Sequence, residues 1–369
     1  MSRARDLADL AGSADAGGLT GRNLIINGAM QVAQRSTSVA SLSSTATYST
    51  CDRWEVQYGS SGTFTESQST TAPSGFSNSL KLDCTSADAS PNYLVLMQCL
   101  EGQNLQHLKK GTSAAESTTL SFYVRSSKTG TYQVNLRDLD NSRIIGATYT
   151  ISSANTWEFK SITFAGDTTG AFDNNNGASL DIEWWLAAGS TYNTGAVPTA
   201  WEASTEADRA AGLNVAIGAS TSDDFHLTGV QLEVGPQATP FEHRLIGDEL
   251  RRCFRYYYRV GDENNGGGYH RYAVGSCQGT STCGITVHAP VKMRTTPTLE
   301  QTGTASNYAL YEADSVHACT SVPAINSAHS GPSNFNVTLT SLGNLGNGNA
   351  AEAVNNNNTT SYLAFAAEL

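Results

Sequence analysis

Residues 118–125 read Thr-Thr-Leu-Ser-Phe-Tyr-Val-Arg, a stretch in which apolar and polar side chains alternate. We expect Leu120, Phe122 and Val124 on one face of an extended chain, because successive side chains of a β-strand point to opposite faces. Residues 52–58, which read Asp-Arg-Trp-Glu-Val-Gln-Tyr, alternate in the same way. Both stretches predict strands with one buried face, as in a sheet that packs on a core.

Stretches of this kind follow one another through residues 23–243, and the turns between them are rich in Gly, Asn, Asp and Ser. Many short strands between regular turns indicate a β-sandwich, and a span of about 220 residues suits one large jelly roll. The expected strands are 23–30, 52–58, 79–84, 93–100, 118–125, 131–136, 143–151, 157–164, 180–186 and 224–234.

Residues 244–260 differ from the rest of the chain in charge and periodicity. They hold five arginines against Asp248 and Glu249, in a chain whose net charge is −11. Apolar side chains recur at the spacing of an amphipathic helix in the first half, whereas the second half also alternates as a strand does. We expect a helix over 247–254 that passes into a strand at 255–260, so that this segment joins two domains.

Residues 261–369 are predicted to form a second, smaller β-sandwich domain. Its expected strands are 270–277, 284–289, 298–302, 308–312, 335–339 and 360–366. The seven cysteines of the chain include no CxxC pair and are scattered, which indicates free buried thiols. Cys277 and Cys283 are the exception, because their spacing suits a hairpin, and whether they form a disulfide stays open. The predicted fold class is all-β: a jelly-roll sandwich, a short helix and a smaller sandwich.

Composition excludes several classes of protein. Only 15% of the residues are charged, and the solvent-facing helix formers Lys, Glu and Arg are scarce, which disfavours a helical enzyme. No stretch approaches the ~20 apolar residues that cross a membrane. The net charge of −11 disfavours nucleic acid and anionic membranes as partners, since both attract basic surfaces.

The sequence offers no standard catalytic or cofactor motif, and we expect neither catalysis nor a cofactor. It lacks GxxxxGK[ST], HExxH and GxSxG, and its seven histidines are not spaced as metal ligands. Asp181 and Glu183 share one face of a strand, where they fit either a loose glycosidase pair or an ordinary solvated face. The segment 173–177, Asp-Asn-Asn-Asn-Gly, offers oxygen ligands for calcium or simply forms a turn.

Aromatic residues are the best candidates for a binding surface, because sugars stack their apolar C–H faces on aromatic rings. Trp184 and Trp185 are consecutive, so they point to opposite faces of a strand. Alternation places Trp184 in the core and Trp185 on the outer face with Asp181 and Glu183. Trp185 and Trp201, which lies in an expected loop, are therefore candidate glycan contacts, with core or subunit packing as the alternative.

Residues 1–22 form a separate piece of the chain. Leu7 and Leu10 give a short apolar stripe at helical spacing, and Ser-Ala-Asp-Ala-Gly-Gly at 13–18 ends it. A helix this short does not hold itself together in water. Two interpretations stay open: a frayed terminus, or an anchor that folds only against a partner.

Several segments become informative in combination. Residues 21–38 read Gly-Arg-Asn-Leu-Ile-Ile-Asn-Gly-Ala-Met-Gln-Val-Ala-Gln-Arg-Ser-Thr-Ser, and Asp-Arg-Trp stands at 52–54. Residues 227–244 read Leu-Thr-Gly-Val-Gln-Leu-Glu-Val-Gly-Pro-Gln-Ala-Thr-Pro-Phe-Glu-His-Arg, and Arg-Cys-Phe-Arg-Tyr-Tyr-Tyr-Arg follows at 252–259. Together they resemble the fibre and appendage proteins of tailed bacteriophages, particularly marine and cyanobacterial ones. The opening residues 2–10 resemble the start of many such fibres.

The resemblance implies a virion structural protein with a carbohydrate-binding-like jelly roll, no catalysis and a homotrimeric assembly. Residues 1–22 would then dock on the particle, with Arg3, Arg5, Leu7 and Leu10 as the anchoring side chains. The second β domain would be distal and meet the host surface, and other phage structural proteins would be partners.

Under the same resemblance, the segment 244–260 would pack along the three-fold axis, with Arg251, Arg255, Tyr257 and Tyr258 as interface candidates. The position on the particle stays open between tail fibre, capsid fibre and a decoration or cement protein. Two alternatives remain: a depolymerase that cuts host polysaccharide, and a free carbohydrate-binding module of a secreted enzyme.

Overall fold

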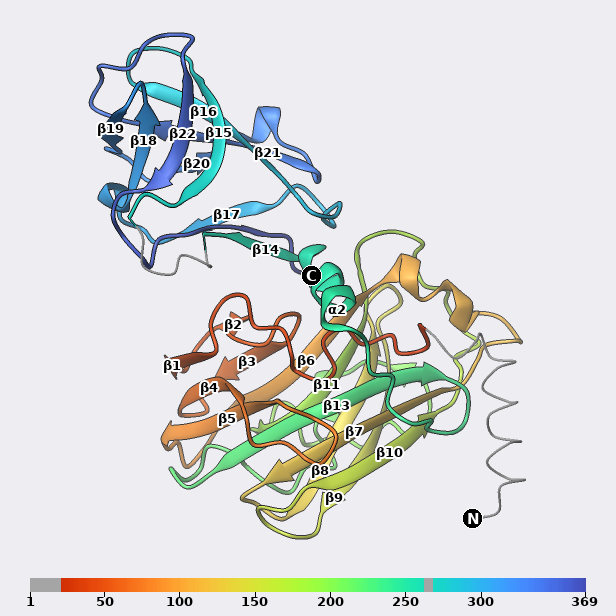
Figure 1. The fold of residues 1–369 in the computed structure, drawn as a ribbon. Coiled ribbons are helices and arrows are strands. Elements are labelled where there is room, and N and C mark those ends of the chain that lie inside the picture. The colour runs from red at the N-terminus through yellow and green to blue at the C-terminus, as the bar shows by residue number, and fades with distance from the viewer. Residues whose placement is uncertain (1–20, 262–267) are drawn as a thin grey trace. The chain divides into compact units, whose positions relative to one another are not determined.

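The computed structural model describes residues 21–261 and 268–369, which divide into two compact units. The boundary falls between Glu249 and Leu250, inside the segment 244–260, and Leu369 groups with the first unit. Figure 1 labels the strands of both units, except β12 and β23. The predicted anchoring residues Arg3, Arg5, Leu7 and Leu10 lie outside the described residues.

The N-terminal unit consists of two antiparallel sheets. The six-stranded sheet has the order β1-β4-β5-β13-β7-β10, and the seven-stranded sheet has the order β12-β9-β8-β11-β6-β3-β2. Their strands are β1 (Ser38–Leu42), β2 (Ala46–Thr47), β3 (Glu55–Gly59), β4 (Thr63–Ser69), β5 (Ser79–Ser86), β6 (Tyr93–Glu101), β7 (Thr118–Ser126), β8 (Gly130–Asp138), β9 (Arg143–Ile151), β10 (Glu158–Phe164), β11 (Ala178–Ala188), β12 (Glu202–Ala203) and β13 (Asp224–Val234).

One hydrophobic core fills the space between these two sheets. Trp54, which directly precedes β3, Phe122 of β7 and Trp184 of β11 are fully buried in it, and the rings of Trp54 and Trp184 lie 5.6 Å apart. The residues of β3 after Trp54 alternate between half-buried and buried, as the period of a strand requires. The predicted sandwich and its inward face are therefore confirmed.

The first expected strand, 23–30, is absent. Asn27 and Met30 both have positive φ angles (58° and 55°), a conformation that ends extended structure. The Leu24 N–H still donates to the Leu232 carbonyl (2.9 Å), so this segment lies along β13 without forming a strand.

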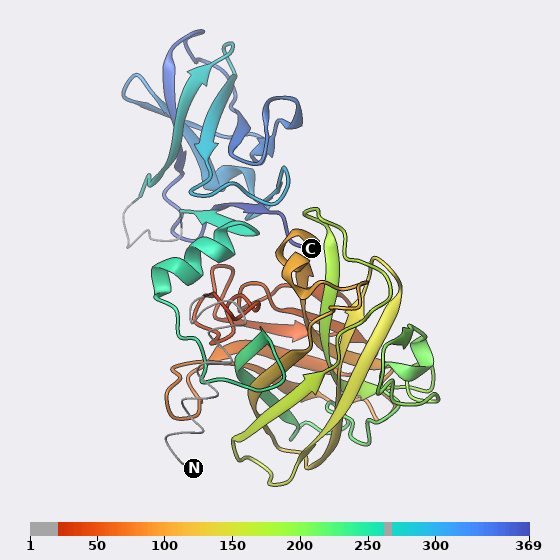
Figure 2. The ribbon, with the colours of Figure 1, turned by 90° about the vertical axis from the view of Figure 1, so that its right-hand side faces the viewer.

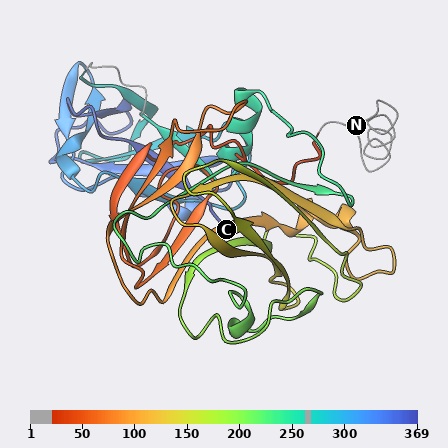
Figure 3. The same ribbon diagram turned by 90° about the horizontal axis from the view of Figure 1, so that it is seen from below.

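The helix α2 (Ile246–Phe254) crosses the boundary between the units, and its residues from Leu250 onward belong to the C-terminal unit. This unit continues with β14 (Tyr257–Val260). The predicted helix followed by a strand is confirmed. Its further strands are β15 (Arg271–Cys277), β16 (Thr282–His288), β17 (Thr298–Gln301), β18 (Tyr308–Glu312), β19 (Ser315–Ala318), β20 (Ala324–Ile325), β21 (Asn334–Thr340), β22 (Ala350–Asn355) and β23 (Leu363–Ala366). They are the strands coloured cyan to blue in Figures 2 and 3.

Two sheets enclose the core of this unit. One has the order β14-β23-β17 and the other β19-β18-β22-β15-β16-β21-β20. Phe335 of the larger sheet stacks on Phe365 of the smaller one, with ring centroids 4.2 Å apart. The unit is thus a second, smaller sandwich, and the all-β fold class holds throughout the described chain. No helix among residues 21–261 and 268–369 is long and apolar enough to cross a membrane.

Candidate functional site

Three of the segments that carry the phage-fibre resemblance, 21–38, 52–54 and 227–244, meet in the N-terminal unit. The Asn23 side chain donates to the Val230 carbonyl (3.1 Å) and accepts from the Leu232 N–H (3.1 Å). The Arg244 guanidinium donates to the Ile25 carbonyl (2.9 Å). Residues 23–25 are therefore hydrogen-bonded to the segment 227–244.

A second set of bonds reaches Asp-Arg-Trp. The Asn27 side chain donates to the Asp52 carbonyl (3.0 Å), and the Trp54 indole N–H donates to the Asn27 carbonyl (3.1 Å). Gly28 then lies directly against β13: a Cβ on Gly28 would be 2.2 Å from the Val230 oxygen. Only glycine permits this approach, because a backbone oxygen cannot rotate away as a side chain would.

These bonds join residues 21–28, 52–54 and 227–244 into one unit, which we call the clasp. Asn23, Asn27 and Trp54 are buried, so they present nothing to a ligand. The motif is a structural device that holds the start of the sandwich to its last strand.

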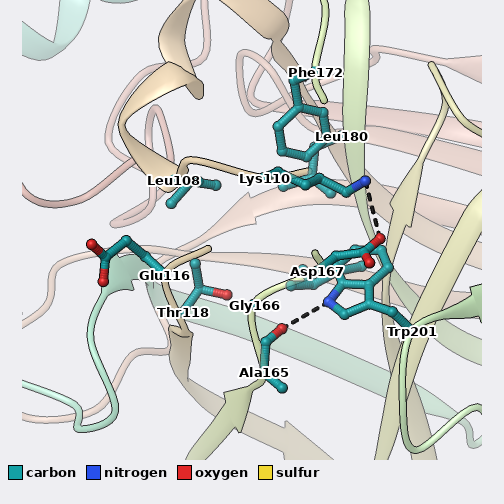
Figure 4. Close-up of a pocket in the computed structure, with 11 residues that line it drawn as sticks. Leu108, Lys110, Glu116, Thr118, Ala165, Gly166, Asp167, Phe172, Leu180 and Trp201 are labelled. Atoms are coloured by element: carbon teal, nitrogen blue, oxygen red, sulfur yellow. Dashed lines mark hydrogen bonds and ion pairs between the residues drawn. The ribbon is translucent and has the colours of Figure 1, made fainter. Parts of the chain in front are cut away.

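The predicted contact Trp201 lines a small pocket at one end of the sandwich (Figure 4). Its indole N–H donates to the Ala165 carbonyl (2.7 Å), and the Lys110 amine lies 5.4 Å from its ring. The pocket volume is about 20 Å³, room for roughly one water molecule. This pocket does not admit a sugar ring, and Trp201 covers a buried lysine.

Lys110 is the centre of that pocket. Its amine contacts Asp138 (2.5 Å) and Asp167 (3.1 Å), and it donates to the carbonyls of Thr169 (2.9 Å) and Gly170 (2.7 Å). The Lys110 side chain is 4% exposed and that of Asp138 is fully buried. Lys110 therefore ties three loop and strand ends together as a structural charge.

A wider depression of about 380 Å³ lies beside the same lysine. It is lined by Leu105, Gln106, Lys109, Lys110, Thr112, Ala171 and Phe172. The Gln106 amide donates to the Gly102 carbonyl (2.9 Å), and Lys109 pairs with Glu116 (2.6 Å). The polar groups of the depression already have partners within the chain.

Trp185 lies on the predicted outer face of β11, but it packs against the same chain and is not exposed as a glycan contact. Trp184 points into the main core, and Trp185 points to the opposite side of β11. There the loop between β11 and β13 covers it: the Arg209 guanidinium lies 5.0 Å from the Trp185 ring, and the Tyr192 ring is also 5.0 Å away. Trp185 is 1% exposed and is not available to a glycan.

Asp181 and Glu183 share this covered face, so the solvated alternative is also wrong. Arg137 pairs with both carboxylates at 2.8 Å, and Arg209 pairs with Glu183 at 2.8 Å. Burial, and then the charge of Glu183, raise the pKa of Asp181 to about 6. Burial acts in the same direction on Glu183, but the guanidinium groups of Arg209 and Arg137 outweigh it and lower the pKa of Glu183.

The segment 173–177 forms an exposed turn closed by its own side chains. The Asn175 amide donates to the Asp173 carboxylate (3.1 Å), and the Gly177 N–H donates to Asn175 (2.7 Å). Within the part of the chain that the structure describes, no group of three His, Cys, Asp or Glu side chains is placed to hold a metal ion.

An aromatic surface that the sequence did not reveal covers the outer face of the six-stranded sheet. Phe159 of β10 is 51% exposed and lies opposite Tyr123 of β7, with ring centroids 5.1 Å apart. The Tyr123 ring contacts Phe76 (5.5 Å), which contacts Phe241 (5.0 Å). Half-buried Trp157 stands two residues before Phe159. We call these five residues the aromatic face; β13, β7 and β10 lie side by side in Figure 1.

A glycine in β13 makes room for these rings. Gly229 has a φ of +61°, and the β13–β7 register shifts between Thr228 and Gln231, as at a bulge. A Cβ on Gly229 would lie 2.7 Å from the Phe76 ring. In the sequence, a glycine within the expected strand 224–234 was the one sign of this surface. The five aromatic residues come from distant segments and form no pattern in the sequence.

Hydroxyl groups border the aromatic face. The exposed Ser161 and Thr163 of β10 lie opposite Ser121 and Thr119 of β7, which are buried. Aromatic rings beside polar side chains give a surface that is apolar at its centre and able to form hydrogen bonds at its edge.

The candidate interface residues fall into two groups. Tyr257 is 1% exposed, and Tyr258 stacks on Phe365 of the same unit (6.4 Å). Arg251 is exposed on α2, and Arg255 donates to the Lys292 carbonyl (3.3 Å). The assignment of these four residues to a subunit interface stays a prediction.

No family model matches the chain, and no curated protein matches its sequence. Solved structures of similar shape include the enzymatically active domain of tailspike protein 4 of bacteriophage CBA120 (13% identity, 58% of this chain, 21% of that chain, TM-score 0.31). Another is TmCBM61 in complex with β-1,4-galactotriose (9% identity, 58% of this chain, 100% of that chain, TM-score 0.30). A third is the family 11 carbohydrate-binding module of Clostridium thermocellum in complex with a β-1,3-1,4-mixed-linked tetrasaccharide (10% identity, 51% of this chain, 91% of that chain, TM-score 0.28). These likenesses carry no functional argument.

Proposed function

We propose that this protein is a structural component of a phage virion, an appendage of tail-fibre or capsid-fibre type that binds glycans on the host surface. The combination of sequence motifs supports the phage assignment. The clasp adds to that support, because three motif segments that are distant in sequence form one hydrogen-bonded unit. In this proposal residues 1–22 dock on the particle, the chain is a homotrimer, and it acts in the virion.

The exposed aromatic face carries the glycan-binding part of the proposal. Phe159 is exposed over half of its surface on an edge strand, where a single apolar residue would be tolerated but an extended aromatic group is unusual. Tyr123 and Trp157 extend the ring surface along and across the strands, and hydroxyls border it. Saccharides match such a surface, since they present C–H faces and hydroxyl edges.

The state of the carboxylate pair supports binding without catalysis. A glycosidase needs one carboxyl to donate a proton and a second to act on the sugar. Asp181 and Glu183 are instead covered by a loop and paired with Arg137 and Arg209. A depolymerase would have to use other carboxylates, so we propose that the protein is not an enzyme.

Binding is tested with fluorescently labelled protein and bacteria of the strain that propagates the phage. Trp157→Ala/Phe159→Ala should lower cell binding at least tenfold, and surface polysaccharide extracted from these cells should compete with the wild type. Tyr269→Ala is the matched control, because Tyr269 is 41% exposed in the other unit. Equal binding by the double variant and the control would reject the aromatic face as the glycan site.

The same incubation tests catalysis. The extracted polysaccharide should keep its chain length and release no new reducing ends in the presence of the protein. Release of oligosaccharides would favour the depolymerase alternative.

The virion role is tested separately with antibodies raised against the folded chain. Immunogold labelling of purified particles should decorate the tail or the capsid, and the label's position chooses between the two fibre types. Particles without label would reject the virion assignment.

A further inference from the structure

Two cysteines of the C-terminal unit lie directly opposite each other in a hairpin. Cys277 ends β15 and Cys283 stands in β16, and the antiparallel register pairs these two residues. The Cys277 N–H donates to the Asn349 carbonyl (2.8 Å), and its carbonyl accepts from the Gly348 N–H (2.9 Å). Both backbone groups of Cys277 thus bond on the side away from β16.

Cys277 and Cys283 are therefore a non-hydrogen-bonded pair. The next residues confirm this alternation, because the Gln278 N–H donates to the Thr282 carbonyl (2.8 Å). In such pairs the Cα atoms are about 4.5 Å apart and the side chains are at their closest. A disulfide requires a Cα separation of roughly 4.4–6.8 Å, so the backbone already satisfies its geometry.

No other pair of opposite strand residues in the described chain brings two cysteines together. All seven cysteines are buried, and Cys277 and Cys283 carry free thiols. Cys319 lies in the same core, but its backbone partner is Ser341. Burial, and then contact with Cys277, raise the pKa of the Cys283 thiol, which keeps this thiol protonated and slow to react in a reducing cytoplasm.

We propose that Cys277 and Cys283 form an oxidation site that closes into a disulfide when the chain meets a low-molecular-weight disulfide such as oxidised glutathione. A thiolate of the pair attacks one glutathione sulfur and expels the other as glutathione thiolate. The second thiol, once deprotonated, attacks the mixed disulfide and expels the second glutathione. The pair loses two electrons and two protons, and one oxidised glutathione becomes two reduced molecules.

The bond would close the hairpin tip, residues 277–283, after assembly. Cross-linking across a short loop stabilises mainly by restricting the unfolded chain, and for a unit of this size it should raise the melting temperature by roughly 5–10 °C. The exposure of the chain to an oxidant rests on the proposed virion role, because virus particles leave the reducing cytoplasm. The chemistry of the pair rests on its geometry alone.

Peptide mapping tests the proposal with the full-length chain. One sample is kept in a phosphine reductant and another in oxidised glutathione until its mass no longer changes, and both are denatured and alkylated. Trypsin places Cys277 and Cys283 in the peptide 272–292 and Cys319 in the peptide 295–369. After oxidation, we expect 272–292 to be lighter by two hydrogen atoms and to carry no alkyl group.

Variants supply the control. Cys283→Ala should abolish the increase in melting temperature on oxidation, whereas Cys319→Ala, in the same core, should retain it. The proposal is overturned if both thiols of 272–292 remain alkylatable after oxidation, or if 272–292 becomes cross-linked to 295–369. Failure of cell binding or virion labelling would reject the proposed function and leave this result unaffected.

Discussion

Replacing Lys110 with methionine is the most direct test of the N-terminal unit. Lys110→Met keeps the length and much of the volume of the side chain but removes its charge and its donors. Two carboxylates, Asp138 and Asp167, and two carbonyls then lose their amine partner; Figure 4 shows Lys110 with Asp167.

The loss in the free energy of unfolding depends on which partners the two carboxylates keep. Removing one partner of a buried ion pair costs about 3–5 kcal/mol, because the other charge stays buried. Arg143 still pairs with Asp167 (2.6 Å), and Asn141 still donates twice to Asp138 (3.0 Å each). We therefore expect the lower end, about 3 kcal/mol, and a fall in melting temperature of roughly 6–12 °C.

Urea unfolding followed by tryptophan fluorescence measures this change, because all five tryptophans belong to the N-terminal unit. Lys109→Met is the matched control. The Lys109 side chain is 54% exposed and pairs with Glu116 at the surface, so its loss should cost no more than about 1 kcal/mol. If the two variants unfold within about 1 kcal/mol of each other, Lys110 is not the structural charge that its burial indicates.

Two further predictions concern buried groups of the same unit. Raising the pH from 5 to 8 should lower the contribution of Glu66 to the free energy of unfolding by about 3 kcal/mol, because burial raises the pKa of Glu66 from 4.5 to about 7 and the folded chain keeps a proton that the unfolded chain has lost. Urea titrations of Glu66→Gln should show most of this slope removed, whereas an unchanged slope would reject the assignment. Gly28→Ala should cost roughly 1–3 kcal/mol by the same assay, since its Cβ would meet the Val230 carbonyl. Gly247→Ala, with no atom within 4 Å of its Cβ, should not destabilise the protein.

Strands with one buried face were predictable from the sequence. The expected strands 143–151 and 224–234 match β9 and β13 residue for residue. Their apolar side chains alternate with polar ones, and local alternation suffices when one face packs on the core. The helix and strand of 244–260 followed from the same kind of local pattern.

Features that depend on tertiary contacts were not predictable. Residues 23–30 have the composition of a strand, but two left-handed residues and bonds from the Asn27 side chain hold the segment in a turn. Trp185 has the alternation of an exposed residue, yet a loop that begins after β11 returns to cover it. No periodicity within a strand reports what a distant loop places on its outer face.

The candidate site escaped the sequence for a related reason. Phe76, Tyr123, Phe159 and Phe241 are separated by tens of residues, and only the pairing of β10 with β7 and the bulge at Gly229 bring their rings together. The tryptophans predicted as glycan contacts, Trp185 and Trp201, instead cover buried charges.

Under the proposed function, the clasp and the aromatic face have separate roles: the clasp holds the fold, and the aromatic face binds the glycan. The residues that identify the family resemblance, such as Asn23, Asn27 and Trp54, are buried and hold the backbone, so a substitution there would unfold the sandwich. Gly229 belongs to the same motif, but its effect is to shape the outer surface on which the rings lie. A scaffold built in this way can keep its motif and its bulge while the exposed residues change, as Phe159 can, because that side chain supports no core packing. The proposed glycan binding therefore assigns specificity to exposed positions around the bulge rather than to the motif residues themselves.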